Sequence, residues 1–138
     1  MTGFEMFWPL LAHVLLVFAL YGLLRLRRLR LVAAGKMTEE DIRWCTNEPP
    51  ESRAVNNCIA NQFQLPLFFY ICCVLLFITE ADNIAMVVAG WAFVASRYLH
   101  AIVHVTSNRL AWRFPLFMTG FVLLAGMWLW LAVWMATS

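Results

Sequence analysis

Four long apolar runs constrain this chain of 138 residues more than any other feature. They extend from about residue 6 to 24, 55 to 79, 84 to 105 and 114 to 136. A helix needs about 20 apolar residues to cross the hydrocarbon core of a bilayer, where backbone polar groups must be satisfied without water. The runs therefore predict an all-α membrane protein, in which four transmembrane helices form one up-down bundle over residues 1–138.

The composition supports lipid as the solvent of this fold. Hydrophobic residues make up 63% of the chain and charged residues only 13%, whereas a soluble domain carries roughly a quarter charged residues. The net charge of +2 is too small to indicate a nucleic-acid partner. The first apolar run lacks a basic leader and is longer than the core of a signal peptide, so we expect it to be a span.

The loops between the runs predict an orientation. Residues 25–53 form a long charged loop that holds seven of the ten basic residues, 80–83 an acidic turn, and 107–113 a short basic loop. Loops rich in Lys and Arg stay in the cytoplasm, so the first and third loops are predicted there and both termini on the opposite side. In a bacterium the membrane would be the inner one. Thr38, followed three residues later by Asp41, predicts a short capped helix inside the first loop.

Polar side chains interrupt the apolar runs in one half of the predicted bundle. Arg97, His100 and His104 share one helix face, at spacings of three and four residues. The second run carries a polar stripe, and single arginines end the first run and begin the fourth. These further residues are Arg25, Arg53, Asn57, Asn61, Gln64 and Arg113. Together they predict a basic, amide-lined pocket for a small anionic, peptide-like molecule, with a lipophilic partner arriving from the bilayer.

Simpler interpretations of these residues remain open. The arginines after the first run can be juxtamembrane anchors, the amides can join helices by hydrogen bonds, and Arg97 can be structural. His13 lies toward the other side and is interpreted as a hydrogen-bonded histidine of the bundle. His100 and His104 lack an accompanying carboxylate, and the four cysteines lack a C-x-x-C pair, so no metal site is predicted.

The order and spacing of these motifs resemble the MAPEG superfamily, membrane-associated proteins of eicosanoid and glutathione metabolism, in a bacterial-type form. One piece is the segment Asn61 to Tyr70, which is similar to the family pattern of Asn, then Glu, then Pro and aromatic residues. The other is Arg97, His100 and His104, followed by Arg113 at the start of the fourth run. The Arg25-Leu26-Arg27-Arg28 exit from the first run also matches.

The resemblance implies a homotrimer that binds glutathione as a co-substrate between subunits and contacts membrane lipid. The implied binding residues are Arg25, Arg53, Asn57, Asn61, Gln64, Arg97, His100 and His104. Arg113 would be catalytic, stabilising the glutathione thiolate for attack on a lipophilic electrophile or a lipid hydroperoxide. The implied function is therefore a glutathione-dependent transferase or peroxidase.

Two departures from the family pattern keep a second function open. Gln64 stands where the family has Glu, and His104 where it often has Tyr. A non-catalytic, lipid-binding or scaffolding member of the same fold is the alternative. A four-helix antiporter is disfavoured, because no Asp or Glu lies inside the four predicted spans.

Overall fold

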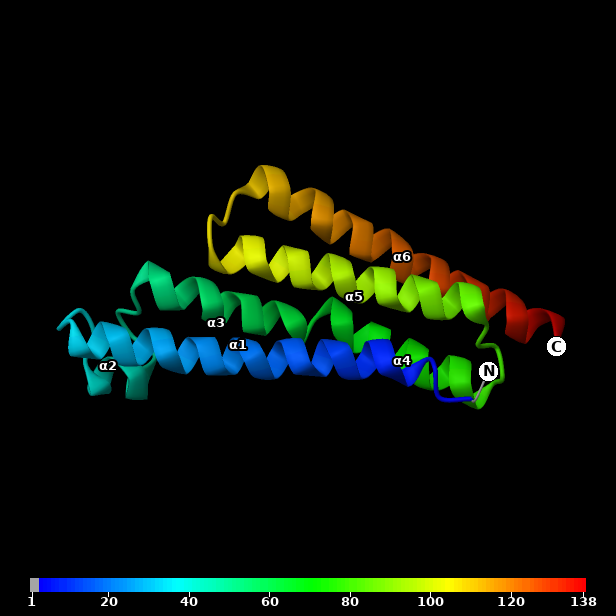
Figure 1. The fold of residues 1–138 in the computed structure, drawn as a ribbon, viewed down its shortest axis with the longest axis horizontal. Helices are drawn as coiled ribbons and strands as arrows, with labels where there is room; N and C mark the ends of the chain where they lie inside the picture. The colour runs from blue at the N-terminus through cyan, green and yellow to red at the C-terminus, as the bar shows by residue number, and fades with distance from the viewer. Residues whose placement is uncertain (1–2) are drawn as a thin grey trace.

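The computed structural model describes residues 3–138, and all six of its elements are helices. Four stretches are long and apolar enough to cross a membrane, the second of them formed by two consecutive helices. The predicted all-α class with four spans is confirmed. The helices are α1 (Phe7–Ala33), α2 (Glu39–Trp44), α3 (Pro50–Gln62), α4 (Leu65–Ile78), α5 (Ile84–Val105) and α6 (Leu110–Thr137) (Figure 1).

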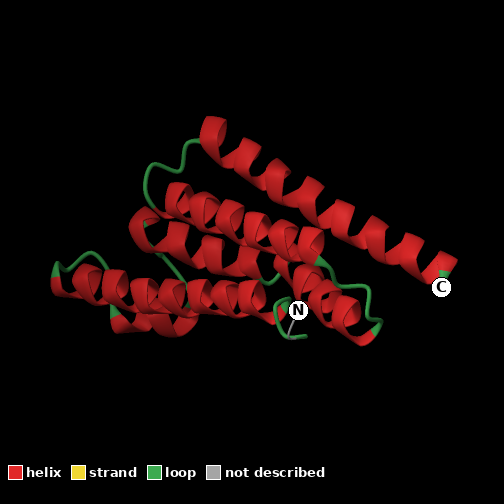
Figure 2. Cartoon of the chain, turned by 45° about the vertical axis from the view of Figure 1, so that its right-hand side comes forward, coloured by secondary structure: helices red, strands yellow, loops and turns green. Residues whose placement is uncertain are grey.

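Helix α5 lies at the centre of the bundle. It packs against α6 on one side and against α1 and α3 on the other, while α6 also contacts α4. The start of α1 and the end of α6 lie at the same end of the molecule (Figure 1), and a short loop joins the antiparallel helices α5 and α6 (Figure 2). The turn that joins α5 to α6 and the segment around α2 lie at the opposite end (Figure 1).

Helix α1 continues well past the end predicted near residue 24. The charged segment Arg25–Arg30 is helical rather than part of a loop, because its Leu and Arg residues are strong helix formers. The helix ends where Gly35 adopts a left-handed conformation with φ 72°. The Gly35 and Lys36 amides donate to the carbonyls of Val32 and Leu31, both at 3.0 Å, which caps the helix.

The short helix predicted in the first loop is present as α2. The Thr38 hydroxyl accepts from the Asp41 amide at 3.1 Å, and the Asp41 carboxylate accepts from the Thr38 amide at 3.0 Å. This reciprocal pair satisfies two donors at the start of the helix. The hydrogen bond from the Thr38 backbone also holds the pKa of Asp41 below its ordinary value.

The second span is divided, where the sequence analysis expected one continuous helix. Helix α3 ends at Gln62 and α4 begins at Leu65, with Gln64 in a non-helical conformation (φ −97°, ψ −104°). The cause is Pro66, which has no amide hydrogen and whose ring would clash with the carbonyl four residues earlier. The polar stripe expected along this span is therefore interrupted before Gln64.

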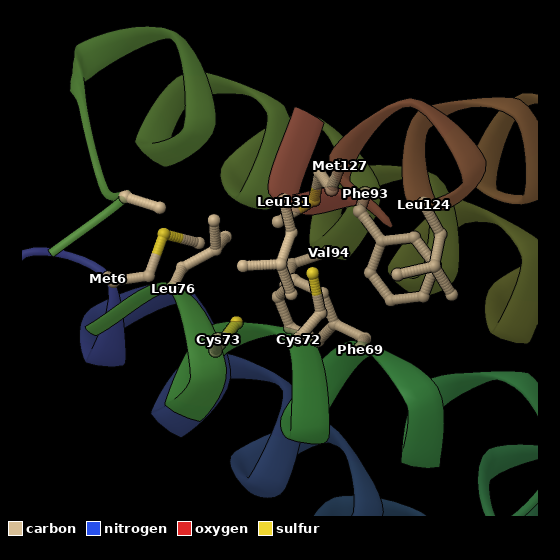
Figure 3. Close-up of a cluster of buried hydrophobic side chains, with 11 residues drawn as sticks. Met6, Phe69, Cys72, Cys73, Leu76, Phe93, Val94, Leu124, Met127 and Leu131 are labelled. Atoms are coloured by element: carbon tan, nitrogen blue, oxygen red, sulfur yellow. The ribbon is translucent and has the colours of Figure 1, made fainter. Parts of the chain in front are cut away.

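Two apolar clusters hold the helices together. One lies toward the termini, where the stacked rings of Phe69 and Phe93, with centroids 4.5 Å apart, join α4 to α5. Leu124, Met127 and Leu131 of α6 cover them (Figure 3). The second cluster joins α1, α3 and α5 nearer the other end of the bundle. It consists of Leu16, Leu20, Leu24, Val55, Cys58, Ile59 and Ala101.

An ion pair ties the end of α1 to the linker that precedes α3. Arg28 Nε donates to Glu48 Oε1 at 2.8 Å, and the Glu48 side chain is only 9% exposed. The hydrogen bond from Arg28 holds the pKa of Glu48 below its ordinary value. A carboxylate that is more acidic in the folded state stabilises that state only while it is ionised.

Glu48→Gln should therefore destabilise the fold at neutral pH and have a shrinking effect in acid. The expected loss is at most about 1 kcal/mol at pH 7. Because the folded pKa lies below the unfolded value of 4.5, the difference from the parent protein should decrease as the pH falls through the folded pKa. Unfolding titrations in detergent at several pH values measure it. Glu40→Gln on the exposed side of α2 is the control, and an equal, pH-independent loss in both variants would contradict the assignment.

Candidate functional site

A buried polar network joins four helices in the middle of the bundle. His13 of α1 lies between Gln62 of α3 and Tyr70 of α4, with His13 Nε2 2.9 Å from Gln62 Oε1 and His13 Nδ1 2.5 Å from the Tyr70 hydroxyl. Arg97 of α5 donates from Nη2 to the same Gln62 Oε1 at 3.3 Å. His13 and Arg97 are fully buried. The network thus crosses the bundle beside the break between α3 and α4.

The donors and acceptors of this network fix its protonation pattern. Gln62 Nε2 donates to the Cys58 carbonyl at 3.1 Å, so Gln62 Oε1 is the end that faces His13 and Arg97. Since that oxygen only accepts, His13 donates from Nε2, and in the neutral ring Nδ1 is then the acceptor for the Tyr70 hydroxyl. His13 is a hydrogen-bonded bundle histidine, as interpreted from the sequence. It is not remote from the polar face of α5, however, because Gln62 joins it to Arg97.

Three of the predicted site residues line the buried side of α5. Arg97, His100 and His104 are all buried, and the rings of the two histidines have centroids 5.8 Å apart. Nε and Nη1 of Arg97, and Nδ1 of each histidine, have no hydrogen-bond partner among residues 3–138. No carboxylate of these residues pairs with Arg97 either. Buried polar atoms without a partner are costly, so this row favours an additional acceptor-bearing group.

Arg113 extends the row beyond the end of α5. It lies in the first turn of α6, is half-buried, and is close enough to His100 to interact with it electrostatically. Its Nη1 donates to Asn108 Oδ1 at 2.7 Å. Asn108 adopts the left-handed conformation with φ 50°, which asparagine tolerates better than most residues. The α5–α6 turn therefore orients the Arg113 side chain.

The remaining predicted residues lie on the surface of the bundle. Arg25, Asn57 and Gln64 are exposed, and Asn61 is partly exposed. Arg53 donates to the Glu48 carbonyl at 2.7 Å, so it also anchors the linker before α3. The structure brings the α5 residues and Arg113 together and leaves the other set facing outward, so one copy of the chain does not gather all nine residues.

Sequence reasoning missed Gln62 as the centre of the buried network. Its signal was present, because Gln62 follows Val55, Cys58 and Ile59 at the i, i+3, i+4, i+7 spacing of one helix face. All four are buried. The apolar residues on the Gln62 face of α3 indicate which side of the helix packs against the bundle, and the polar stripe beside them does not.

Comparison with known families gives one informative match. The model of the MAPEG family matches residues 6–133, which is nearly the whole chain. Searches of curated proteins and of solved structures give no match. The match covers all four membrane-spanning stretches. The chain therefore belongs to the MAPEG family, a group of membrane proteins in glutathione and eicosanoid metabolism.

Proposed function

We propose that this protein is a glutathione-dependent transferase or peroxidase that acts on lipophilic electrophiles or lipid hydroperoxides. The observation that carries the proposal is the row of buried polar atoms without a partner, the Nε and Nη1 donors of Arg97 and a ring nitrogen of each histidine of α5. Glutathione carries two carboxylates and two peptide groups, which supply the acceptors that this row lacks. Guanidinium groups bind carboxylates strongly and with defined geometry.

In this proposal Arg113 acts on the sulfur. A guanidinium beside the glutathione thiol favours the thiolate, which is the nucleophilic form. The thiolate forms a carbon–sulfur bond with an electrophile as the leaving group departs. With a hydroperoxide the sulfur takes the outer oxygen as the oxygen–oxygen bond breaks, giving an alcohol and a sulfenic acid. A second glutathione then forms the disulfide and releases that oxygen as water. Asn108 holds the Arg113 side chain for this role.

The outward-facing polar residues support assembly of several copies. Asn57 and Gln64 are exposed on the second span, which lies in the membrane, and polar groups that face lipid are costly. A homotrimer would cover them and let one subunit supply its amides and arginines to a site completed by the α5 residues of another. Gln64 can still accept a hydrogen bond from glutathione, although it lacks the charge of the Glu in the family pattern.

The decisive test separates binding from thiolate formation. Glutathione added to the purified protein in detergent should produce the ultraviolet band of the thiolate at neutral pH. Arg113→Ala should abolish the band and lower the conjugation rate by about 100-fold or more, the usual cost of losing one group that stabilises developing charge. S-alkyl glutathione carries no thiol, so Arg113→Ala should weaken its binding far less than it lowers the conjugation rate.

Arg109→Ala is the matched control, because Arg109 is an exposed arginine just before α6. It should retain the thiolate band. Absence of glutathione binding together with an uncatalysed conjugation rate would overturn the proposal. A bound lipid at this site and no thiolate band would instead support the non-catalytic, lipid-binding alternative.

A further inference from the structure

A basic cleft lies at the end of the bundle where α1 extends beyond α5 (Figure 1). Its volume is about 710 Å³. One face of α1 forms a wall, the first turns of α3 form another, and the end of α5 with the following turn closes it. The lining residues are Arg27, Arg30, Leu31, Ala34, Lys36, Pro50, Glu51, Ala54, Val105, Thr106 and Asn108.

Arg27 holds the walls of the cleft together through two hydrogen bonds to backbone carbonyls. Its Nη1 donates to the Glu51 carbonyl at 2.8 Å, and its Nη2 donates to the Val105 carbonyl at 2.7 Å. The first bond reaches the start of α3 and the second the last residue of α5. Arg27 therefore fixes the spacing of the three helices, and satisfies a carbonyl that the end of α5 leaves unpaired.

Two cations in the cleft remain unused by the fold. Arg30 and Lys36 are exposed, and neither forms an ion pair or a side-chain hydrogen bond within residues 3–138. With Arg27 they bring three positive charges to the lining, against the single negative charge of Glu51. Leu31, Ala34, Pro50, Ala54 and Val105 supply apolar surface beside these charges. A ligand that suits this lining has an anionic head and an apolar part.

The depth of the cleft indicates where such a ligand comes from. The uncharged part of α1 ends at Leu24, and about 20 residues of helix cross the hydrocarbon core. Arg27, Arg30 and Lys36 therefore lie at the level of the lipid headgroups, where basic clusters attract anionic lipids. We propose that this cleft binds the phosphate-bearing headgroup of an anionic phospholipid at Arg27 and Arg30, with its glycerol and upper acyl carbons against Val105 and Ala54.

The test compares phosphatidylglycerol with phosphatidylcholine, whose headgroup has no net charge. Native mass spectrometry of the detergent-solubilised protein, titrated with each lipid, gives their relative affinities. Arg30→Gln combined with Lys36→Gln should reduce the preference for phosphatidylglycerol about twenty-five-fold, because each basic residue near an anionic surface contributes roughly a five-fold factor. Arg43→Gln combined with Arg109→Gln removes the same charge outside the cleft and should leave the preference within about two-fold of the parent.

A second variant tests the cleft itself without altering its charge. Ala54→Phe fills the space beside α3 and should weaken phosphatidylglycerol binding while circular dichroism stays unchanged. Equal losses in both double variants would indicate diffuse electrostatic attraction and overturn the proposal, as would an unchanged preference in the Arg30 and Lys36 variant. Displacement of the lipid by millimolar inorganic phosphate or glutathione would also overturn it, because a small soluble anion would then be the occupant.

Discussion

Gln62→Leu should destabilise the protein by about 2 to 4 kcal/mol, because it leaves two buried donors without an acceptor, one of them charged. Gln62 Oε1 accepts from both His13 Nε2 and Arg97 Nη2. Leucine has a similar size, so the change removes hydrogen bonds while it largely preserves packing. Water cannot easily replace the lost acceptor, since His13 and Arg97 are fully buried.

The loss can be measured by unfolding the protein with a denaturing detergent in mixed micelles. Gln64→Leu is the matched control, because Gln64 lies two residues away and is exposed. It should change the free energy of unfolding by less than about 0.5 kcal/mol. Gln62→Glu keeps an acceptor for both donors and should cost less than leucine. Equal losses for the leucine variants at positions 62 and 64 would show that the buried network does not stabilise the bundle.

Gly120→Leu should destabilise the protein by about 1 to 3 kcal/mol, because it inserts a large side chain into the tight contact between α5 and α6. A Cβ atom at position 120 would lie 2.9 Å from the Ser96 hydroxyl oxygen and 3.5 Å from the Phe93 ring. Small residues let membrane helices approach closely, where packing provides much of their association energy. The leucine would push α6 away from the centre of the bundle.

Two comparisons separate the effect of the tight α5–α6 contact on stability from the effect of replacing any glycine in α6. Gly126 lies on the same helix, and a Cβ atom there would meet no heavy atom within 4 Å. Gly126→Leu should therefore be neutral or slightly stabilising in the same unfolding titration. Gly120→Ala adds only the Cβ atom and should cause a smaller loss of stability than leucine. Ser96→Ala removes the hydroxyl oxygen nearest that Cβ, so combining the two changes should recover part of this loss. A loss of similar size at positions 120 and 126 would contradict the packing argument.

Local rules of the sequence predicted one short helix correctly and were applied incompletely at two other places. The Thr38 and Asp41 spacing predicted the start of α2, and the reciprocal hydrogen bonds are present. The extent of α1 and the division of the second span were not predicted. In the first case charge was taken to end the helix, although arginine favours helix. In the second, the effect of Pro66 on the preceding turn was overlooked.

The candidate site was predictable in part. The spacing of Arg97, His100 and His104 placed them on one face, and that face is buried. The same reasoning placed Asn57 and Gln64 beside them, but these side chains are exposed in the structure. Spacing gives the face of a helix, while the direction of that face depends on which neighbours it packs against. The sequence analysis therefore predicted that the polar stripe of α3 faces the bundle, whereas the face that carries Gln62 does so.

The sequence by itself determined the four spans, because the length and apolar character of a helix that crosses lipid are local properties. Only the tertiary structure decided that Gln62 joins His13 to Arg97, since these residues are 49 and 35 positions from Gln62 in the chain. The cleft at the end of α1 was also decided by the tertiary structure, because Arg27 forms it by joining α1 to α3 and α5. A contact between distant residues depends on helix rotation and crossing, which no single segment of the sequence specifies.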